Sequence, residues 1–224
     1  QLLDADLKDD IGLDSMEIME LAAHVNSFFN IFDNPKPVYL LSYTRLNDWV
    51  NLVEESLQRS NTVLNFQSSG TTGSPKVIQH RMSFLERELA TLQSLFPNIK
   101  EIITFIPSYT IYGFLFTIGL PQRLSIPVIF PSAVDWTKVS SSSLVVGTPF
   151  HWRLLSQSFT AASQRFSGVS AAATLDPELY AQVLKTVNLT EIYGSTETGG
   201  VGWRKSGTDA FTLFPFWRLD KQAE

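Results

Sequence analysis

The sequence predicts an α/β fold, with mostly parallel sheet covered by helices and preceded by a small all-α bundle. From residue 61 onward, strand-like and helix-like runs alternate, which is the pattern of a parallel sheet with crossover helices. Before that point, two stretches place apolar residues at helical spacing. A very short linker around residues 58–62 separates the two parts, and two domains are ordinary for 224 residues.

The first helix is predicted to begin at Ser15, because a serine oxygen can accept hydrogen bonds from the first N–H groups of a helix. Glu17 and Glu20 lie on its polar face. Its apolar face consists of Ile18, Leu21, Ala22, Val25 and Phe29. A second helix is expected over about residues 44–59. Its apolar stripe consists of Leu46, Trp49, Val50, Val53 and Leu57.

In the second part, six runs read as strands and four as helices. The last helix has Asp176 as its expected cap and Pro177 in its first turn. The expected strands are residues 63–67, 101–106, 126–130, 143–148, 166–171 and 189–193. The expected helices are residues 80–96, 111–120, 150–159 and 176–187.

Residues 68–76 read Ser-Ser-Gly-Thr-Thr-Gly-Ser-Pro-Lys, a composition suited to holding a polyphosphate. Gly70 and Gly73 allow backbone N–H groups to approach an anion closely, and Lys76 adds a positive charge. The hydroxyl donors are Ser68, Ser69, Thr71 and Thr72. The run follows a predicted strand, and ligands collect at strand ends in α/β sheets. A flexible linker is the alternative, and the spacing does not fit a Walker A loop.

A second motif, Tyr-Gly-Ser-Thr-Glu-Thr-Gly-Gly, occupies residues 193–200, again after a strand-like run. In this order, the two motifs resemble those of the adenylate-forming superfamily, which includes acyl-CoA synthetases, aryl-acid ligases and peptide-synthetase adenylation domains. The resemblance implies that residues 61–224 are the N-terminal part of such a ligase, without its C-terminal lid domain. It also implies ATP and Mg²⁺ as ligands.

The resemblance assigns roles residue by residue. Ser69, Thr71, Thr72, Gly73 and Lys76 would hold the β- and γ-phosphates, together with Ser68 and Gly70 in the same loop. Tyr193 would stack on adenine, Thr196 would contact the α-phosphate and Glu197 would bind Mg²⁺. Lys76, Thr196 and Glu197 are thus the expected catalytic residues. Ala171, Ala172, Gly194 and Ser195 would complete the AMP site, and Tyr109, Tyr112, Gly113 and Gly199 the acyl pocket.

Two positions depart from the family pattern. Thr110 stands near the place where many short acyl-AMP ligases carry histidine, and Ala171 replaces a glycine beside adenine. No acidic residue that could bind an α-amine lies between Ile106 and Val134, so a fatty or aryl acid is expected rather than an amino acid.

Residues 12–16 read Gly-Leu-Asp-Ser-Met and are followed by the first amphipathic helix. This context resembles acyl and peptidyl carrier proteins over residues 1–60, without their first helix. The resemblance implies that Ser15 takes a 4′-phosphopantetheine arm, with a phosphopantetheinyl transferase and carrier proteins as partners. The alternative is that Ser15 only begins a helix.

The expected function is therefore ATP-dependent activation of a carboxylic acid and transfer of the acyl group to a carrier thiol. It would belong to fatty-acid, polyketide or aryl-polyene biosynthesis. The alternative is a carrier joined to a nucleotide-binding module without turnover. This alternative arises because the chain contains no match to the family's ribose aspartate or C-terminal lysine. A fragment of a longer protein is favoured over a degenerate family member.

Composition excludes several other classes. The net charge of −5 argues against nonspecific binding of nucleic acid, and the absence of cysteine excludes disulfides and thiolate metal sites. No apolar run is long enough to span a membrane, and no signal-peptide pattern is present, so a cytoplasmic location is expected.

Overall fold

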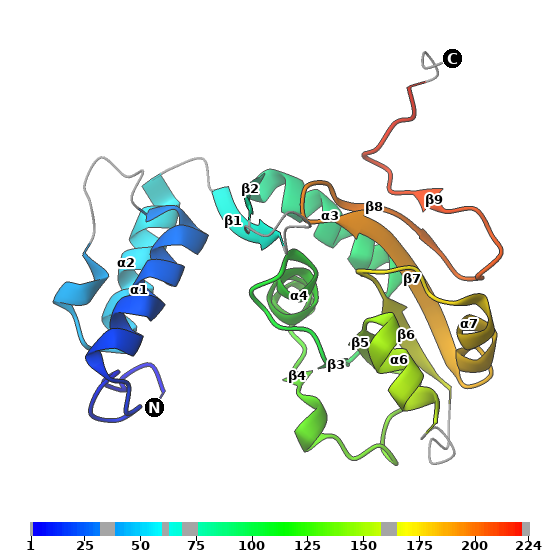
Figure 1. Cartoon of the computed structure of the whole chain (residues 1–224), viewed down its shortest axis with the longest axis horizontal. Coiled ribbons are helices and arrows are strands. Elements are labelled where there is room, and N and C mark those ends of the chain that lie inside the picture. Colours follow the sequence, from blue (N-terminus) through cyan, green and yellow to red (C-terminus); the bar gives the residue numbers. More distant parts are fainter. Residues whose placement is uncertain (1, 32–38, 60–62, 69–75, 158–164, 221–224) are drawn as a thin grey trace. The chain divides into compact units, whose positions relative to one another are not determined.

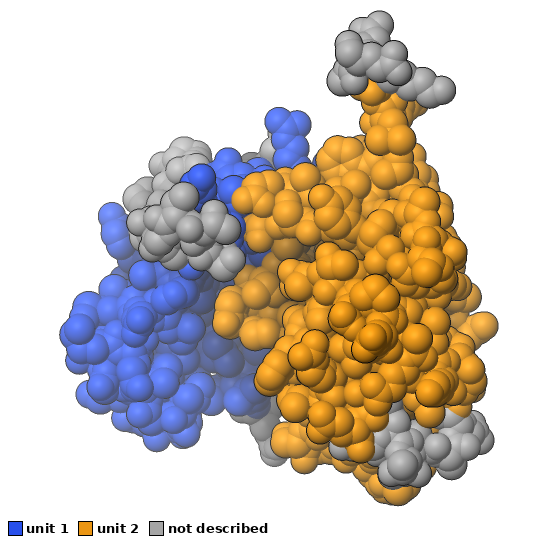
Figure 2. All heavy atoms as spheres, turned by 45° about the vertical axis from the view of Figure 1, so that its right-hand side comes forward, with its two compact units in different colours: residues 1–84 blue, residues 85–224 orange. Residues whose placement is uncertain are grey.

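The computed structural model describes residues 2–31, 39–59, 63–68, 76–157 and 165–220 (Figure 1). The chain divides into two compact units, residues 1–84 and 85–224, which are coloured separately in Figure 2. Among the described helices, none has the length and apolar character needed to cross a membrane.

The first unit contains two helices and a β-hairpin. The apolar faces of the helices meet around Ala22 and Trp49, together with Leu7, Ile31 and Leu40, which confirms the predicted helices. Leu21 is the exception, because its side chain is exposed. The elements are α1 (Ser15–Phe29), η2 (Leu40–Ser42), α2 (Leu46–Arg59), β1 (Val63–Ser68) and β2 (Lys76–Arg81).

Helix α1 begins at Ser15, but its cap is the preceding carboxylate. Asp14 Oδ1 accepts hydrogen bonds from the N–H groups of Met16 at 2.8 Å and Glu17 at 2.9 Å. Glu17 Oε2 in turn accepts from the N–H of Asp14 at 2.8 Å, which completes a capping box. The prediction that the Ser15 oxygen caps the helix is therefore wrong.

The β1–β2 hairpin corrects two predictions. Residues 76–81 form β2, whereas a helix was predicted from residue 80. β2 pairs antiparallel with β1, from Val63 opposite Arg81 to Ser68 opposite Lys76. In the described part of the chain, these two strands form a sheet of their own. Residues 68–76 therefore join two antiparallel strands and do not follow a strand of the large parallel sheet.

The second unit is built on a seven-stranded sheet with the order β4-β3-β5-β6-β7-β8-β9. The strands from β4 to β7 pair in parallel, as predicted, and β8 and β9 add antiparallel pairs at one end. The strands are β3 (Glu101–Thr104), β4 (Val128–Ile129), β5 (Ser143–Gly147), β6 (Phe166–Ser170), β7 (Val187–Ser195), β8 (Gly199–Arg204) and β9 (Thr212–Leu213).

Helices cover the sheet of the second unit. Helices α6 and α7 pack on a core that includes Val145, Phe166 and Leu189, with Trp152 and Tyr180 fully buried. Asp176 caps α7 and Pro177 begins it, as predicted. The expected helix at 111–120 continues to Leu124 with one π-helical stretch. The helical elements are α3 (Met82–Leu95), α4 (Ile111–Phe114), η3 (Leu115–Gly119), α5 (Leu120–Leu124), η4 (Pro131–Ala133), α6 (Pro149–Ser156) and α7 (Pro177–Val183).

Candidate functional site

The second sequence motif forms a tight hairpin between β7 and β8. Ser195 pairs with Gly199, so Thr196, Glu197 and Thr198 make the tip. The N–H of Ser195 donates to Thr198 Oγ1 at 3.1 Å, and the N–H of Thr198 donates to Ser195 Oγ at 3.2 Å. Gly199 has a φ of 64°, a conformation that favours glycine. These bonds fix the backbone beneath the predicted phosphate-contacting and metal-binding residues.

Tyr193, the predicted adenine-stacking residue, lies on β7 just before this hairpin with 60% of its surface exposed. Its ring lies beside the Phe211 ring, with centroids 5.6 Å apart. Its cross-strand partner is Gly202, where an added Cβ would lie 2.8 Å from Thr212 O and 3.4 Å from Phe211 Cβ. The absence of a side chain at residue 202 therefore leaves room for Phe211 and for β9, which begins at the next residue.

The turn that contains Ala171 and Ala172 follows β6, the strand next to β7. Ser170, at the end of β6, pairs with Glu191 on β7. Both predicted AMP-binding segments therefore leave the same edge of the sheet, where the carboxyl ends of parallel strands meet. Ala171 is buried, and Ala172 has a φ of 72°, a left-handed conformation that costs an alanine about 1 kcal/mol.

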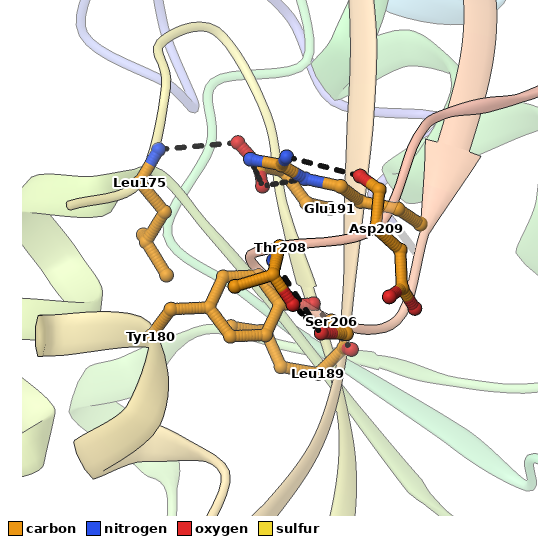
Figure 3. Close-up of polar contacts among 8 residues, drawn as sticks. Leu175, Tyr180, Leu189, Glu191, Ser206, Thr208 and Asp209 are labelled. Atoms are coloured by element: carbon orange, nitrogen blue, oxygen red, sulfur yellow. Dashed lines mark hydrogen bonds and ion pairs between the residues drawn. The ribbon is translucent and has the colours of Figure 1, made fainter. Parts of the chain in front are cut away.

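A buried ion pair joins β7 to β8 close to Tyr193 in the chain, between Glu191 and Arg204 (Figure 3). Glu191 Oε2 accepts from Arg204 Nε at 2.8 Å and lies 2.7 Å from Arg204 Nη2, with both side chains largely buried. The second oxygen, Oε1, accepts from the N–H of Leu175 at 3.1 Å. Arg204 also donates to Asp209 O at 3.3 Å, and its guanidinium lies 4.5 Å from the centre of the Phe211 ring.

Tyr180 of α7 bonds to the backbone of β7. Its hydroxyl donates to Leu189 O at 3.2 Å (Figure 3). Burial, with a smaller contribution from the negative charge of Glu191, raises the pKa of Tyr180 to about 12. The phenol therefore remains a neutral hydrogen-bond donor at physiological pH.

The predicted acyl-pocket residues have defined structural contacts. Tyr112 Oη lies 3.1 Å from Gly147 O and 3.3 Å from Val169 O, the carbonyls near the ends of β5 and β6. Burial raises the pKa of Tyr112 well above its usual value. Gly113 admits no side chain, because a Cβ there would overlap Pro107 O. Tyr109 is 71% exposed, and Gly199 belongs to the hairpin.

Sequence reasoning missed two residues that bond to Gly200 of the motif, Glu88 and Trp217. Glu88 of α3 is buried and its Oε1 accepts from the N–H of Gly200 at 2.8 Å, while the Trp217 indole donates to Gly200 O at 2.7 Å. Burial raises the pKa of Glu88 to about 7, against the opposing effect of the Gly200 bond. A glutamate on the apolar face of a helix, spaced from Leu85 and Leu92, is the signal that could have identified it.

In the first unit, the structure describes only the two ends of the phosphate-loop motif. Ser68 and Lys76 pair directly across the hairpin. The predicted phosphate-binding residues Ser69, Gly70, Thr71, Thr72 and Gly73 lie outside the described residues. Ser15 lies exposed at the first position of α1.

Among the described residues, no cluster of three or more histidine, aspartate or glutamate side chains could hold a metal by itself. The exposed Glu197 at the hairpin tip offers a single carboxylate. This donor set fits Mg²⁺, which proteins often bind through one or two carboxylates together with substrate phosphates.

Comparisons with known proteins give a family and a fold. Residues 18–215 match the family described as AMP-binding enzyme. A 4-coumarate–CoA ligase of Cereibacter sphaeroides is 30% identical over 220 residues, which cover 93% of this chain and 54% of the relative. The enzyme of the same name from Halorhodospira halophila is 30% identical over 221 residues, which cover 95% and 55%. The chain thus spans about half the length of the curated relatives it matches.

Solved structures of similar fold include an Escherichia coli MenE variant with bound OSB-AMS, with a TM-score of 0.58 and 16% identity. That match covers 69% of this chain and 36% of the other. ATP-bound MatB from Rhodopseudomonas palustris gives a TM-score of 0.54 at 16% identity, covering 70% and 36%. At such identities, the likeness concerns the fold alone.

Proposed function

The chain belongs to the AMP-binding enzyme family, and from this premise we propose that it takes part in the ATP-dependent activation of a carboxylic acid as an acyl adenylate. One observation carries the proposal. The turn at Ala171 and Ala172 and the segment that begins at Tyr193 leave neighbouring parallel strands at the same sheet edge. Ligands of α/β sheets bind at such edges.

The AMP part of the substrate is assigned to this edge. The exposed ring of Tyr193 offers a face for stacking on adenine, beside Gly194 and Ser195. The Thr196 hydroxyl at the hairpin tip would donate to the α-phosphate while the carboxylate attacks and pyrophosphate leaves. Glu197 would hold Mg²⁺, which supplies neutralising charge to the phosphates.

The Ser68–Lys76 motif is assigned to the β- and γ-phosphates. Strand pairing holds its two ends opposite each other, and the Lys76 side chain is exposed. Glycines, hydroxyls and a lysine are the donors that a polyphosphate needs.

An aryl acid is the favoured substrate class, with a fatty acid second. The names of the curated relatives, 4-coumarate–CoA ligases, support this choice. Tyr109, Tyr112, Gly113 and Gly199 remain the predicted pocket residues. The activated acyl group would pass to a thiol, either of CoA or of a phosphopantetheine arm on a carrier protein.

A carrier role for Ser15 is the second candidate. Its exposed position at the start of an acidic helix favours modification. The family match from residue 18 onward supports the other assignment, in which α1 belongs to the ligase itself. The intact mass of the chain after treatment with a phosphopantetheinyl transferase, with Ser15→Ala as control, decides between the two assignments.

The proposed AMP site is tested by calorimetric titration of the chain with AMP. Tyr193→Ala is expected to raise the Kd for AMP about tenfold, because stacking of a base on an aromatic ring contributes 1–3 kcal/mol. Tyr43→Ala, an exposed tyrosine of the first unit, serves as the matched control and should leave the Kd unchanged. A wild-type chain that binds no AMP would refute the assignment.

Turnover is tested separately by pyrophosphate exchange with ATP, Mg²⁺ and a panel of aryl and fatty acids. Exchange that depends on an aryl acid supports the proposed activation. Tight AMP binding without exchange for any acid supports the alternative, a nucleotide-binding module without turnover.

A further inference from the structure

The Glu191–Arg204 pair has a geometry that links two separate segments of the sheet edge. Only 3% of the Glu191 side chain and 13% of the Arg204 side chain are exposed. Glu191 Oε2 faces both Nε and Nη2 of Arg204, which leaves Oε1 available for a different partner. One carboxylate thereby bonds to two chain segments at once.

The first linked segment is the turn after β6. Glu191 Oε1 accepts from the N–H of Leu175, shortly after Ala171 and Ala172 (Figure 3). This bond ties the end of the turn to β7. The separation between the turn and β7 is therefore set both by strand pairing and by the carboxylate of Glu191.

The second linked part is the segment that carries Tyr193. Arg204 contacts the Phe211 ring, and the Phe211 ring lies beside that of Tyr193. The guanidinium lies 4.5 Å from the centre of the Phe211 ring, within the range of a cation–π contact. The Phe211 ring in turn lies 5.6 Å from that of Tyr193, at an interplanar angle of 50°. The bond from Arg204 to Asp209 O fixes the chain that leads to Phe211.

Stability alone is a weak reason for such a pair. Replacing a buried ion pair with apolar side chains of similar volume is often neutral or stabilising, because both charges must lose their water. What the pair supplies, and an apolar pair would not, is a set of directional bonds to Leu175, Asp209 and the Phe211 ring.

We propose that Glu191 and Arg204 are positioning residues for adenine, because they hold the ring of Tyr193 and the turn at Ala171 and Ala172 at a fixed separation. The proposal rests on the proposed AMP site and deepens it. Neither residue touches the nucleotide; both act through Phe211, Tyr193 and the backbone of Leu175.

The test is a double-mutant cycle on the whole chain, read by calorimetric titration with AMP. Arg204→Lys keeps the positive charge but loses the planar guanidinium with its several N–H donors. A lysine at this position therefore cannot contact Glu191, Asp209 and the Phe211 ring at the same time. We expect it to raise the Kd for AMP about tenfold in the wild-type background and by less than about twofold in a Tyr193→Ala background. Arg123→Lys, in an exposed pair with Glu86, is the matched control and should change nothing.

Equal losses of affinity in both backgrounds would overturn the positioning role, as would an Arg204→Lys variant with wild-type affinity. Should Arg204→Lys unfold, Phe211→Leu tests the same path, and its loss should likewise vanish when Tyr193 is alanine. A wild-type chain that does not bind AMP overturns the proposed function itself. If the wild-type chain binds AMP but the losses of affinity from Arg204→Lys and Tyr193→Ala are additive, only the positioning role is overturned.

Discussion

At the scale of single residues, the most unusual group is the carboxyl of Glu88. It lies in the interior with one oxygen bonded to the Gly200 N–H, and its other oxygen, Oε2, has no hydrogen-bond partner among the described residues. Burial raises its pKa to about 7, compared with 4.5 for an ordinary glutamate. Glu88 is therefore half neutral near physiological pH, and either protonation state can accept the bond from Gly200.

This raised pKa predicts a pH dependence of stability. Between pH 4.5 and pH 7 the folded carboxyl keeps a proton that the unfolded one releases, so the Glu88 contribution to the free energy of unfolding falls as the pH rises. Glu88→Gln resembles the protonated form. It should match wild type near pH 5 and exceed its free energy of unfolding by about 3 kcal/mol at pH 8.

Urea unfolding at several pH values measures this difference. Glu86→Gln, an exposed glutamate on the same helix, should leave the pH profile unchanged. If the wild-type and Glu88→Gln profiles run parallel from pH 5 to pH 8, the carboxyl is not buried as described.

At the scale of elements, two adjacent residues at the start of α1 have different roles: one caps the helix, and the other is the candidate site of modification. Asp14 caps the helix and Ser15 does not. We predict that Asp14→Ala lowers the stability of the first turn by about 1 kcal/mol, whereas Ser15→Ala changes it by less than about 0.5 kcal/mol. Hydrogen exchange of the Met16 and Glu17 amides measures both effects, and the reverse order would restore Ser15 as the cap.

The regular elements were predictable from sequence where local pattern decides the structure. Helices α1 and α2 have clear apolar stripes, and β5 is a continuous apolar run buried on both faces. The missed strands have no such pattern. β2 is charged and mostly exposed, and β8 contains Gly199, Gly200 and Gly202, so cross-strand pairing rather than propensity makes them strands.

The candidate site could be proposed from the sequence only where its residues are contiguous. The motif at 193–200 could be recognised because its residues are contiguous, but the hairpin that it forms with β8 was not predicted. The supporting residues Glu88, Arg204 and Phe211 belong to no contiguous motif, and only folding brings Glu88 to Gly200 and Arg204 to Glu191. Which residues these side chains contact depends on helix packing and strand register, and neither can be deduced from the local sequence pattern.

At the scale of the whole molecule, each compact unit carries one of the two sequence motifs. Lys76 belongs to the first unit and Tyr193 to the second. The chain matches the family through both units, since the match covers residues 18–215. The two motifs should therefore contribute separably to nucleotide affinity.

Comparison of ATP with AMP separates these contributions. Lys76→Ala is expected to raise the Kd for ATP about tenfold and to leave the Kd for AMP unchanged, because only ATP carries the β- and γ-phosphates. Lys185→Ala, an exposed lysine of the second unit, provides the control. Equal losses for ATP and AMP would contradict the assignment of Lys76 to the terminal phosphates.

Gly200 has one further consequence. A Cβ at this residue would overlap the Phe214 ring and Glu88 Oε1. If β8 slipped by one residue along β7 in the direction that brings Val201 to the place of Gly200, the valine side chain would overlap these groups. The glycine thus opposes a register slip in that direction, and so helps to keep Thr196 and Glu197 at the tip of the hairpin.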